Sequence, residues 1–423
     1  MSGIKIVGGI IVIAGVALAG QWYTKEAYNS AVESQIKTGL KNVGLEGFSV
    51  KRDVVQSDFF SFNDTIQMEI APSIVDPNGT LGLTEPWVMS YSSDCRIFPL
   101  YIQCDNRMNG ITGLFPELAS QFDDFSYSIH TDFNALTRTI TSEFRSEAFS
   151  AEEDQARFDL KPIHLNTTSD FDFGEITFSG TFNGLDIATS GAAQGAVMLS
   201  DMSFEGEMSR AFDTVYTGRA HMTVSEYEME SAGQSVLSGT QASFTSVTAQ
   251  QDDTFSVQYT ASLDAVTTSG AMPMVLEDVN FDMKLSGVAA GAMKYLSGYS
   301  QSLETPEELT KFVDILGKQP LTLTLHDFSL TQNNAKATLS GSAKMAPFTM
   351  SDVQQGTFLQ KLNATLNMLF DESFPQAVPA LAPMLNQYIQ MGVIQQNEAG
   401  KFESEVTLED NTLKANGSVL SQF

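Results

Sequence analysis

Cysteine, histidine and tryptophan are scarce in this chain of 423 residues, which has two, four and two of them respectively. Metal sites built from thiolate and imidazole ligands need several such residues at short spacing. The four histidines are scattered, and no histidine lies near either cysteine in the sequence. The glycine-rich loops that hold nucleotide phosphates are missing as well. We therefore expect no zinc-type site and no cofactor.

Basic residues are outnumbered more than two to one by acidic ones. The chain has 23 Lys and Arg against 51 Asp and Glu, a formal net charge of −28. Such a surface repels phosphate groups, so no binding to nucleic acid is expected and attraction to an anionic lipid surface is disfavoured. The ordinary consequence of this acidity is solubility. An apolar fraction of 42% is enough for a real core, and the length allows two or three domains.

Motifs for catalysis are also missing, since no Gly-x-Ser-x-Gly sequence is present. The pair His326 and Asp327 could orient an imidazole, but such a histidine is more often a half-exposed strand residue. The spacing of Ser34 and Lys37 resembles a Ser/Lys signature, yet it lies in a predicted helix beside the membrane. Three carboxylates on one strand could hold Ca²⁺ but are more typical of a wet surface; they are Glu226, Glu228 and Glu230. We assign no catalytic, cofactor-binding or metal-binding residues and expect a protein that is not an enzyme.

The long hydrophobic run of the chain is at its beginning. The segment Ile4–Gly20 is apolar apart from Lys5, and its length of about 17 residues is at the short end for a spanning helix. An aromatic pair follows, where the outer interface of the bilayer would be. Positive charge on the short flank predicts export of the rest of the chain. We predict a single-pass anchor over residues 1–22 in a bacterial inner membrane, with the body in the periplasm; its main residues are Ile6, Ile10, Ile13, Leu18, Trp22 and Tyr23.

A cleaved signal peptide is the alternative, because Ala17–Ala19 fits the small-residue cleavage pattern. A helical pattern nevertheless continues past the aromatic pair, which favours retention and predicts a helical stalk over residues 23–48. The apolar positions of this stalk are Tyr28, Val32, Ile36, Leu40 and Val43. Either interpretation places the body outside the cytoplasm.

The two cysteines, Cys95 and Cys104, are close enough in sequence for a disulfide across a hairpin or loop. The alternative is a pair of free, buried thiols. An exported body favours the disulfide, because disulfides persist in oxidising compartments.

Alternating apolar and polar residues dominate residues 49–288, which we predict to be a β-rich periplasmic domain. The alternation is clear over Ile176–Phe182, Phe255–Tyr259 and Val279–Leu285, where Thr, Ser and Gln on the other face suit a sheet with one wet side. Glycine recurs after such pairs, as at Gly287 and Gly341, and marks bulges or bends.

Residues 289–423 read as a C-terminal α+β region. Thr305 and Glu308 form a capping box around Pro306, and Gly317 ends the helix that they begin. A second capping pattern at Ser351 predicts a helix with four apolar residues inward, and a further helix is predicted beyond it. The inward residues of the second helix are Phe358, Leu362, Leu366 and Leu369, and those of the third are Leu381, Leu385 and Ile389. The fold class expected is α+β, β-dominated: an N-terminal transmembrane helix, then a long twisted antiparallel sheet or sandwich with several amphipathic C-terminal helices packed on it.

Several motifs together resemble the YdgA-like bacterial proteins, the family named domain of unknown function 945. They are Gly20–Thr24 after the hydrophobic run, Pro320–Leu325 with Leu339–Gly341, and the closing pattern of Tyr388–Ile394, Lys401–Leu408 and Leu413–Gly417. The resemblance implies an inner-membrane anchor, a periplasmic β-rich domain and no assigned chemistry. The cysteine pair is not a feature of that resemblance.

The main functional expectation is a non-catalytic structural or binding role in the cell envelope. Binding or transfer of lipid or another hydrophobic ligand along a curved sheet is the first alternative, and an envelope hydrolase is the second. The expected partners are the membrane and either lipid or another envelope protein. A continuous apolar groove, open and several strands long, would favour the lipid alternative.

Overall fold

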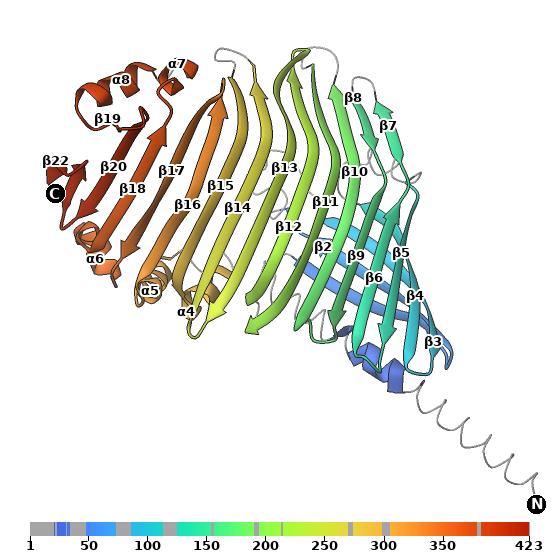
Figure 1. Ribbon diagram of the computed structural model, residues 1–423. Helices are drawn as coiled ribbons and strands as arrows, with labels where there is room; N and C mark the ends of the chain where they lie inside the picture. Colours follow the sequence, from blue (N-terminus) through green and yellow to red (C-terminus); the bar gives the residue numbers. More distant parts are fainter. Residues whose placement is uncertain are drawn as a thin grey trace, which may run out of the picture. The chain divides into compact units, whose positions relative to one another are not determined.

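The computed structural model describes most of the chain after its first 20 residues. The described residues are 21, 23–30, 32–33, 48–72, 86–112, 125–153, 156–189, 194–212, 215–269, 274–297, 305–378 and 382–422. They form two compact units, one within residues 1–151 and 160–182 and the other within residues 152–159 and 183–423. Both units are built on antiparallel β-sheet, and helices are few (Figure 1). The predicted β-dominated fold with a large antiparallel sheet is confirmed.

The first unit is a meander in which each strand pairs antiparallel with the next. Its order is β1 (Phe48–Ser57), β2 (Ser61–Ile70), β3 (Trp87–Phe98), β4 (Tyr101–Thr112), β5 (Tyr127–Asn134), β6 (Thr139–Ser146), β9 (Ile163–Asp170) and β10 (Glu175–Thr189). The second half of β10 belongs to the other unit. Two short strands, β7 (Phe149–Glu153) and β8 (Ala156–Leu160), lie between β6 and β9 in the chain.

A helical segment at residues 23–30 packs on one face of the first unit. The ring of Tyr28 lies 4.9 Å from that of Phe62 and 5.4 Å from that of Phe133. Both cysteines belong to the same buried cluster, and Val32 packs against it. This part of the predicted stalk is therefore a component of the folded unit rather than a free-standing helix.

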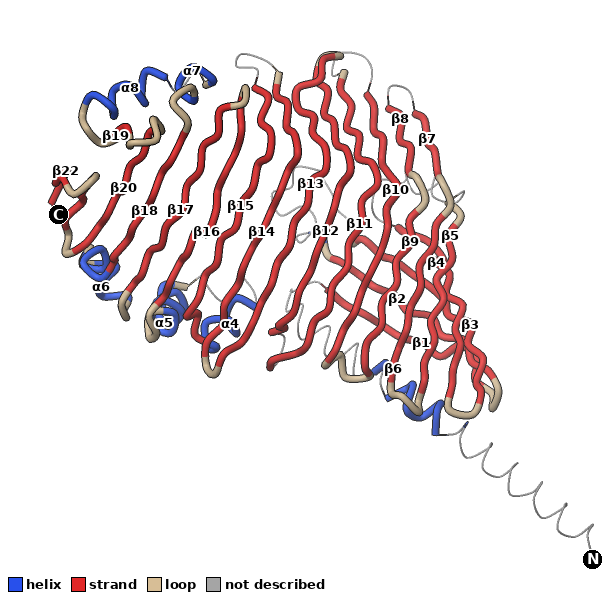
Figure 2. The backbone as a smooth tube through the Cα atoms, in the orientation of Figure 1, coloured by secondary structure: helices blue, strands red, loops and turns tan. Residues whose placement is uncertain are grey.

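The second unit is a longer antiparallel meander (Figure 2). Its strands are β11 (Gly195–Phe212), β12 (Val215–Ser231), β13 (Gln234–Gln251), β14 (Thr254–Thr268), β15 (Met274–Ala289), β16 (Leu321–Gln332), β17 (Ala335–Met345), β18 (Leu362–Phe370), β20 (Phe402–Glu409), β21 (Thr412–Ala415) and β22 (Ser418–Gln422), with β19 (Gln395–Gln396) on β20. Its helices are α4 (Ala290–Ser297), α5 (Pro306–Leu316), α6 (Met350–Gln354), the 3₁₀-helix η3 (Thr357–Lys361), α7 (Phe374–Ala377) and α8 (Ala382–Gln390).

Tight turns join these strands because the turn residues accept the left-handed conformation. Asn333 and Asn334, with φ of 49° and 63°, connect β16 to β17, and Asp410 and Asn411, with φ of 49° and 59°, connect β20 to β21. Two successive positive φ values define the hairpin turn whose twist matches that of the flanking strands, and asparagine tolerates them well.

The first C-terminal helix is confirmed and the second prediction is wrong. The Thr305 side chain accepts a hydrogen bond from the Glu308 amide at the start of α5, and Gly317 caps its end. At the second site the cap is Thr349, paired with Asp352, and α6 ends after five residues. Leu362, Leu366 and Leu369 then lie on strand β18, because that segment forms ladders with both β17 and β20.

Several predictions fall on the undescribed part of the chain. The anchor residues Ile6, Ile10, Ile13, Leu18 and Trp22 lie outside the described residues, as do Ser34 and Lys37. Among the described residues no helix is long and apolar enough to cross a membrane. The two compact units also divide the chain differently from the boundaries predicted at residues 48 and 288, since β15 spans residue 288 and pairs with β16.

Candidate functional site

The most distinctive surface of the second unit is one face of its sheet, which we call the apolar face. Three rows of cross-strand partners follow one another across β11 to β18 on this face. The first row is Phe204, Met222, Phe244, Ala261, Phe281, Phe328, Leu339 and Met368. The second is Gly206, Ala220, Ser246, Tyr259, Met283, Leu325, Gly341 and Leu366, and the third is Met208, Gly218, Thr248, Val257, Leu285, Leu323, Ala343 and Ala364.

None of the residues in these three rows is buried. Met222, Phe244 and Leu323 expose 38%, 39% and 40% of their surface. The ring of Tyr259 stacks beside that of Phe244 at 5.9 Å, which places both side chains on the same face. Eight strands at a spacing of about 4.8 Å make this surface roughly 34 Å wide. A soluble protein seldom exposes so wide an apolar surface unless something binds to it.

The opposite face of the same strands is polar. Ser203 and Thr223 share a hydrogen bond of 2.6 Å across β11 and β12, and Ser243 and Ser262 share one of 2.7 Å across β13 and β14. The His221 ring contacts Thr245 at 2.8 Å. These side chains form hydrogen bonds with one another, and a polar face of this kind can be exposed to solvent.

The described helices of this unit lie towards the ends of its strands (Figure 1). At one end, α4 and α5 form a buried cluster with Phe255 and Val288. At the other end, residues of α7 and α8 pack with Ala337 and Phe370. The three rows lie between these two clusters, so the exposed apolar band runs across the strands.

One border of the band is a row of backbone kinks. Asp201 in β11, Gln241 in β13 and Asp278 in β15 have φ of 46°, 51° and 49°. Apolar residues stand at even positions of β11 after Asp201, whereas the four residues at positions 196–199 before it are all apolar. Left-handed residues and bulges re-aim the side chains that follow, and the alternation in β11 begins after Asp201.

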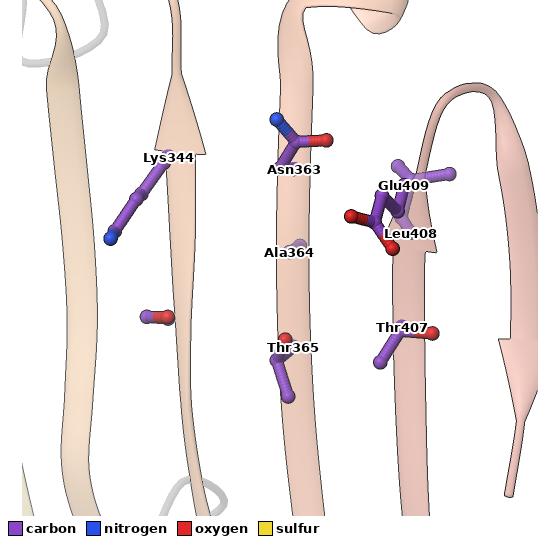
Figure 3. Close-up of a pocket in the computed structure, with 8 residues that line it drawn as sticks. Lys344, Asn363, Ala364, Thr365, Thr407, Leu408 and Glu409 are labelled. Atoms are coloured by element: carbon purple, nitrogen blue, oxygen red, sulfur yellow. The ribbon is translucent and has the colours of Figure 1, made fainter. Parts of the chain in front are cut away.

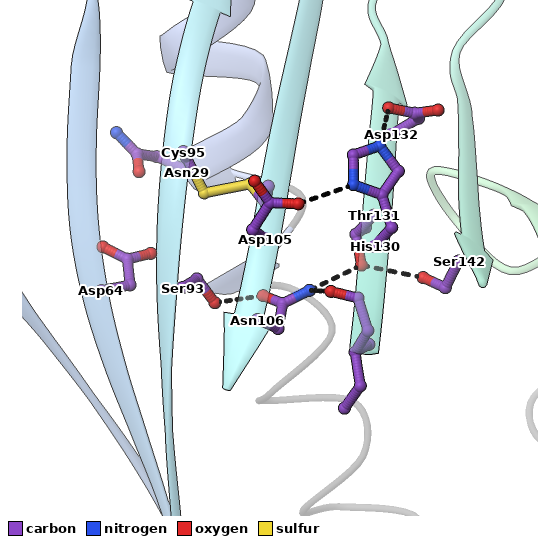
Figure 4. Close-up of a disulfide and its surroundings, with 12 residues drawn as sticks. Asn29, Asp64, Ser93, Cys95, Asp105, Asn106, His130, Thr131, Asp132 and Ser142 are labelled. Atoms are coloured by element: carbon purple, nitrogen blue, oxygen red, sulfur yellow. Dashed lines mark hydrogen bonds and ion pairs between the residues drawn. A yellow bond between two sulfur atoms is a disulfide. The ribbon is translucent and has the colours of Figure 1, made fainter. Parts of the chain in front are cut away.

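The predicted disulfide fits the structure. The sulfur atoms of Cys95 and Cys104 are 2.06 Å apart, on paired positions of β3 and β4. Beside it, side chains form a hydrogen-bonded chain across four strands, from Ser93 through Asn106 and Thr131 to Ser142 (Figure 4). These buried and half-buried polar groups satisfy one another, which identifies the region as part of the core.

His130 lies in a charged cluster of the first unit. Its Nδ1 lies 3.0 Å from an oxygen of Asp105 and its Nε2 lies 3.1 Å from an oxygen of Asp132 (Figure 4). Burial opposes charging of the ring, but the hydrogen bonds and charges of the two carboxylates outweigh it and raise the pKa of His130 above 6.5. Burial, assisted by Asp132, also raises the pKa of Tyr101 to about 12. This environment favours a charged imidazole, whereas a general base must be neutral near pH 7.

The other polar candidates do not converge on a reaction centre. His326 is exposed on β16, and Asp327 accepts a hydrogen bond from Ser329. Within the described residues no group of three or more His, Cys, Asp or Glu side chains could hold a metal ion. This holds for the acidic residues of β12 as well.

A shallow depression lies on the polar face of β17, β18 and β20 (Figure 3). Its volume is about 210 Å³, and Lys344, Asn363, Thr365, Thr407 and Glu409 are among the residues that line it. One lysine on β17 and one glutamate on β20, with β18 between them, are ordinary for a wet face. The depression adds no chemistry to the site described above.

Residues 115–422 match the family described as bacterial proteins of unknown function, DUF945. The chain belongs to this family. The DUF945 match spans the whole apolar face and the C-terminal helices, so the surface described above lies inside the family region. No curated protein and no solved structure matches the chain.

The rows of the apolar face could not be assembled from the sequence. Alternation in Phe255–Tyr259 and Val279–Leu285 predicted apolar strand faces, and both segments contribute. Which strands are neighbours, and in which register, depends on long-range pairing that alternation does not encode.

Proposed function

We propose that this protein binds the hydrocarbon chains of lipids along its apolar face, without catalysing a reaction. The observation that carries this proposal is the band of half-exposed apolar side chains across eight strands. Covering one such side chain contributes roughly 1 kcal/mol, so contacts with several of them give useful affinity.

The chemistry of the band favours hydrocarbon over protein as its occupant. Among the 24 positions of the three rows, only Ser246, Thr248 and Tyr259 have polar side-chain atoms. Protein interfaces carry about one hydrogen bond per 100–200 Å², and this surface offers few donors or acceptors because the strand backbones are already paired. A partner without polar groups matches it best.

The dimensions also suit an acyl chain. One leaflet of a bilayer provides about 15 Å of hydrocarbon, half of the full thickness. The band is about twice as wide as that. An acyl chain that lies across the strands can therefore contact apolar side chains along its whole length.

We place this activity outside the cytoplasm of a bacterial cell, at the inner membrane. The hydrophobic run over residues 1–22, the positive flank and the cysteine pair support this location. A membrane-anchored protein with a lipid-binding surface would lie next to the bilayer that contains its ligand.

The test uses the full chain in phosphatidylcholine nanodiscs and a photoactivatable C16 fatty alcohol. We expect labelling of the native chain to fall at least tenfold in Phe244→Asp, because a carboxylate on the band would have to be desolvated by the ligand. Thr245→Asp puts the same charge on the next residue of the same strand, on the polar face, and should label like the native chain. Equal labelling of the native chain and both variants would overturn the proposal.

A further inference from the structure

One charged side chain stands on the apolar face. Between the row of left-handed residues and the α4–α5 cluster, Arg210 is the single charged residue on this face of the described strands β11 to β18. It follows Met208 of the third row and precedes Phe212, which packs on the helix-covered cluster. Arg210 therefore lies at a corner of the apolar band.

The guanidinium of Arg210 is held by its cross-strand neighbour. Its Nε and one terminal nitrogen donate to the Tyr216 hydroxyl at 3.3 and 3.1 Å, and its carbon lies 5.6 Å from the centre of the Tyr216 ring. This stacking fixes the plane of the guanidinium while its other N–H donors remain available.

Arg210 is also without a carboxylate partner in the part of the chain that the structure describes. Its polar contacts there are to Tyr216, although acidic residues outnumber basic ones 51 to 23 in this chain. Arginine on an apolar surface keeps its charge, so it remains a donor for an anion. A carboxylate or a phosphate suits its planar fork, with two parallel hydrogen bonds.

We propose that Arg210 binds the anionic headgroup of an amphiphile whose hydrocarbon chain lies along the band. This inference rests on the proposed function and names the ligand class: a single molecule with a carboxylate or phosphate at one end and an acyl chain at the other. The net charge of −28 repels an extended anionic membrane surface. A single anionic headgroup, by contrast, can pair with the Arg210 guanidinium on the apolar face.

The position of Arg210 also sets the direction of the ligand. It belongs to β11, and the three rows continue from there towards β18. A chain of about 15 Å that starts at β11 reaches across roughly three strands, to β14. The methyl end of a bound C16 chain then lies near Val257 and Tyr259.

The experiment uses the full chain in phosphatidylcholine nanodiscs and three photoactivatable C16 probes: a fatty acid, an alkyl phosphate and a fatty alcohol. We expect Arg210→Gln to weaken labelling by the fatty acid, the alkyl phosphate or both by about tenfold to a hundredfold, the range for losing a hydrogen bond to a charged group. Labelling by the alcohol should not change. Arg210→Lys should retain part of the labelling by the anion.

Arg219→Gln is the matched control, since Arg219 lies on the polar face of the adjacent strand, one residue after the partner of Met208. It should leave all three probes unchanged. A loss with one anion only would identify the headgroup as that anion. Equal loss of alcohol and anions in Arg210→Gln, or no loss of either anion, would overturn the role of Arg210 while leaving the apolar face intact. If the alcohol labels the native chain no better than it labels Phe244→Asp, the proposed function itself fails.

Discussion

Arg52 and Asp64 form a buried ion pair beneath the helical segment of the first unit. The guanidinium contacts one carboxylate oxygen of Asp64 from two nitrogens, at 2.7 and 2.5 Å, and the two side chains expose 7% and 0% of their surface. The same guanidinium donates to Asn29 on the helix at 2.9 Å and lies over the ring of Tyr28. Lys25 and Gln21, one and two helical turns before Asn29, donate to the carbonyls of Asp58 and Ile97. The helix is thus fixed to the sheet along one side.

Removing one member of this pair should destabilise the first unit strongly. The expected loss of unfolding free energy for Asp64→Asn is about 3 to 5 kcal/mol, because the Arg52 charge would remain buried without its partner. Asp172→Asn is the matched control: it breaks the exposed pair with Arg138 in the same unit and should change stability by less than about 1 kcal/mol. Chemical denaturation of both variants measures the difference, and a similar small loss in each would contradict the role given to Asp64.

Reduction of the disulfide should weaken the first unit moderately. Cys95 and Cys104 close a loop with a sequence separation of 9, for which the chain-entropy estimate is about 2 to 3 kcal/mol. The double variant with alanine at both positions should lose a similar amount, with or without reductant. Unfolding of oxidised and reduced native protein gives the comparison, and no difference between them would mean that the bridge does not stabilise the fold.

The His130 cluster predicts a pH-dependent contribution to stability. The pKa of His130 is raised in the folded state, so its stabilising effect is present below the unfolded pKa of about 6.5 and is lost as the pH rises through the folded value. The native chain should therefore lose unfolding free energy between pH 5.5 and pH 8, and His130→Gln should lose less. The difference should be under about 1 kcal/mol, because the cluster is partly exposed. His326→Gln, on an exposed strand position, serves as the control. If the stability of His130→Gln has the same pH dependence as that of the native chain, His130 does not have this stabilising role.

Gly287 should tolerate no side chain. Its φ is +84°, and a Cβ there would lie 2.0 Å from the Pro320 carbonyl oxygen, at the bulge where β15 passes β14. Gly287→Ala should lower the unfolding free energy by about 2 kcal/mol or more, since backbone strain and a steric clash add. Gly356 has a similar φ of +71° with nothing within 4 Å, so Gly356→Ala isolates the strain, which is about 1 kcal/mol. Equal losses in the two variants would show that the clash is relieved.

Local signals in the sequence predicted local structure well. Thr305 and Gly317 predicted a helix correctly, because the Thr305 side chain accepts from a backbone amide at its start and the Gly317 amide donates to carbonyls at its end. The error at β18 has a physical reason. Its apolar residues stand at 362, 364, 366, 368 and 370 as well as at helical spacing, and the ladders with β17 and β20 decide between the two.

The candidate site depends on what local signals do not contain. Each strand showed an apolar face by alternation, but the register that aligns Phe244 with Ala261 and Phe281 is set by pairing along the whole meander. A role for Arg210 could not be predicted from the sequence. What distinguishes this residue is that it is the single charged one on the apolar face of the described strands, and that follows from the strand pairing.

Under the proposed function, hydrocarbon covers the apolar face in the cell. The most direct measurement places photoreactive benzoyl-phenylalanine at position 281 of the full chain in living bacteria, with position 282, on the opposite face of the same strand, as the control. After irradiation, mass spectrometry of the purified chain should find lipid adducts at 281 and few at 282. Adducts of another protein at 281, or no adduct at that position, would contradict the claim.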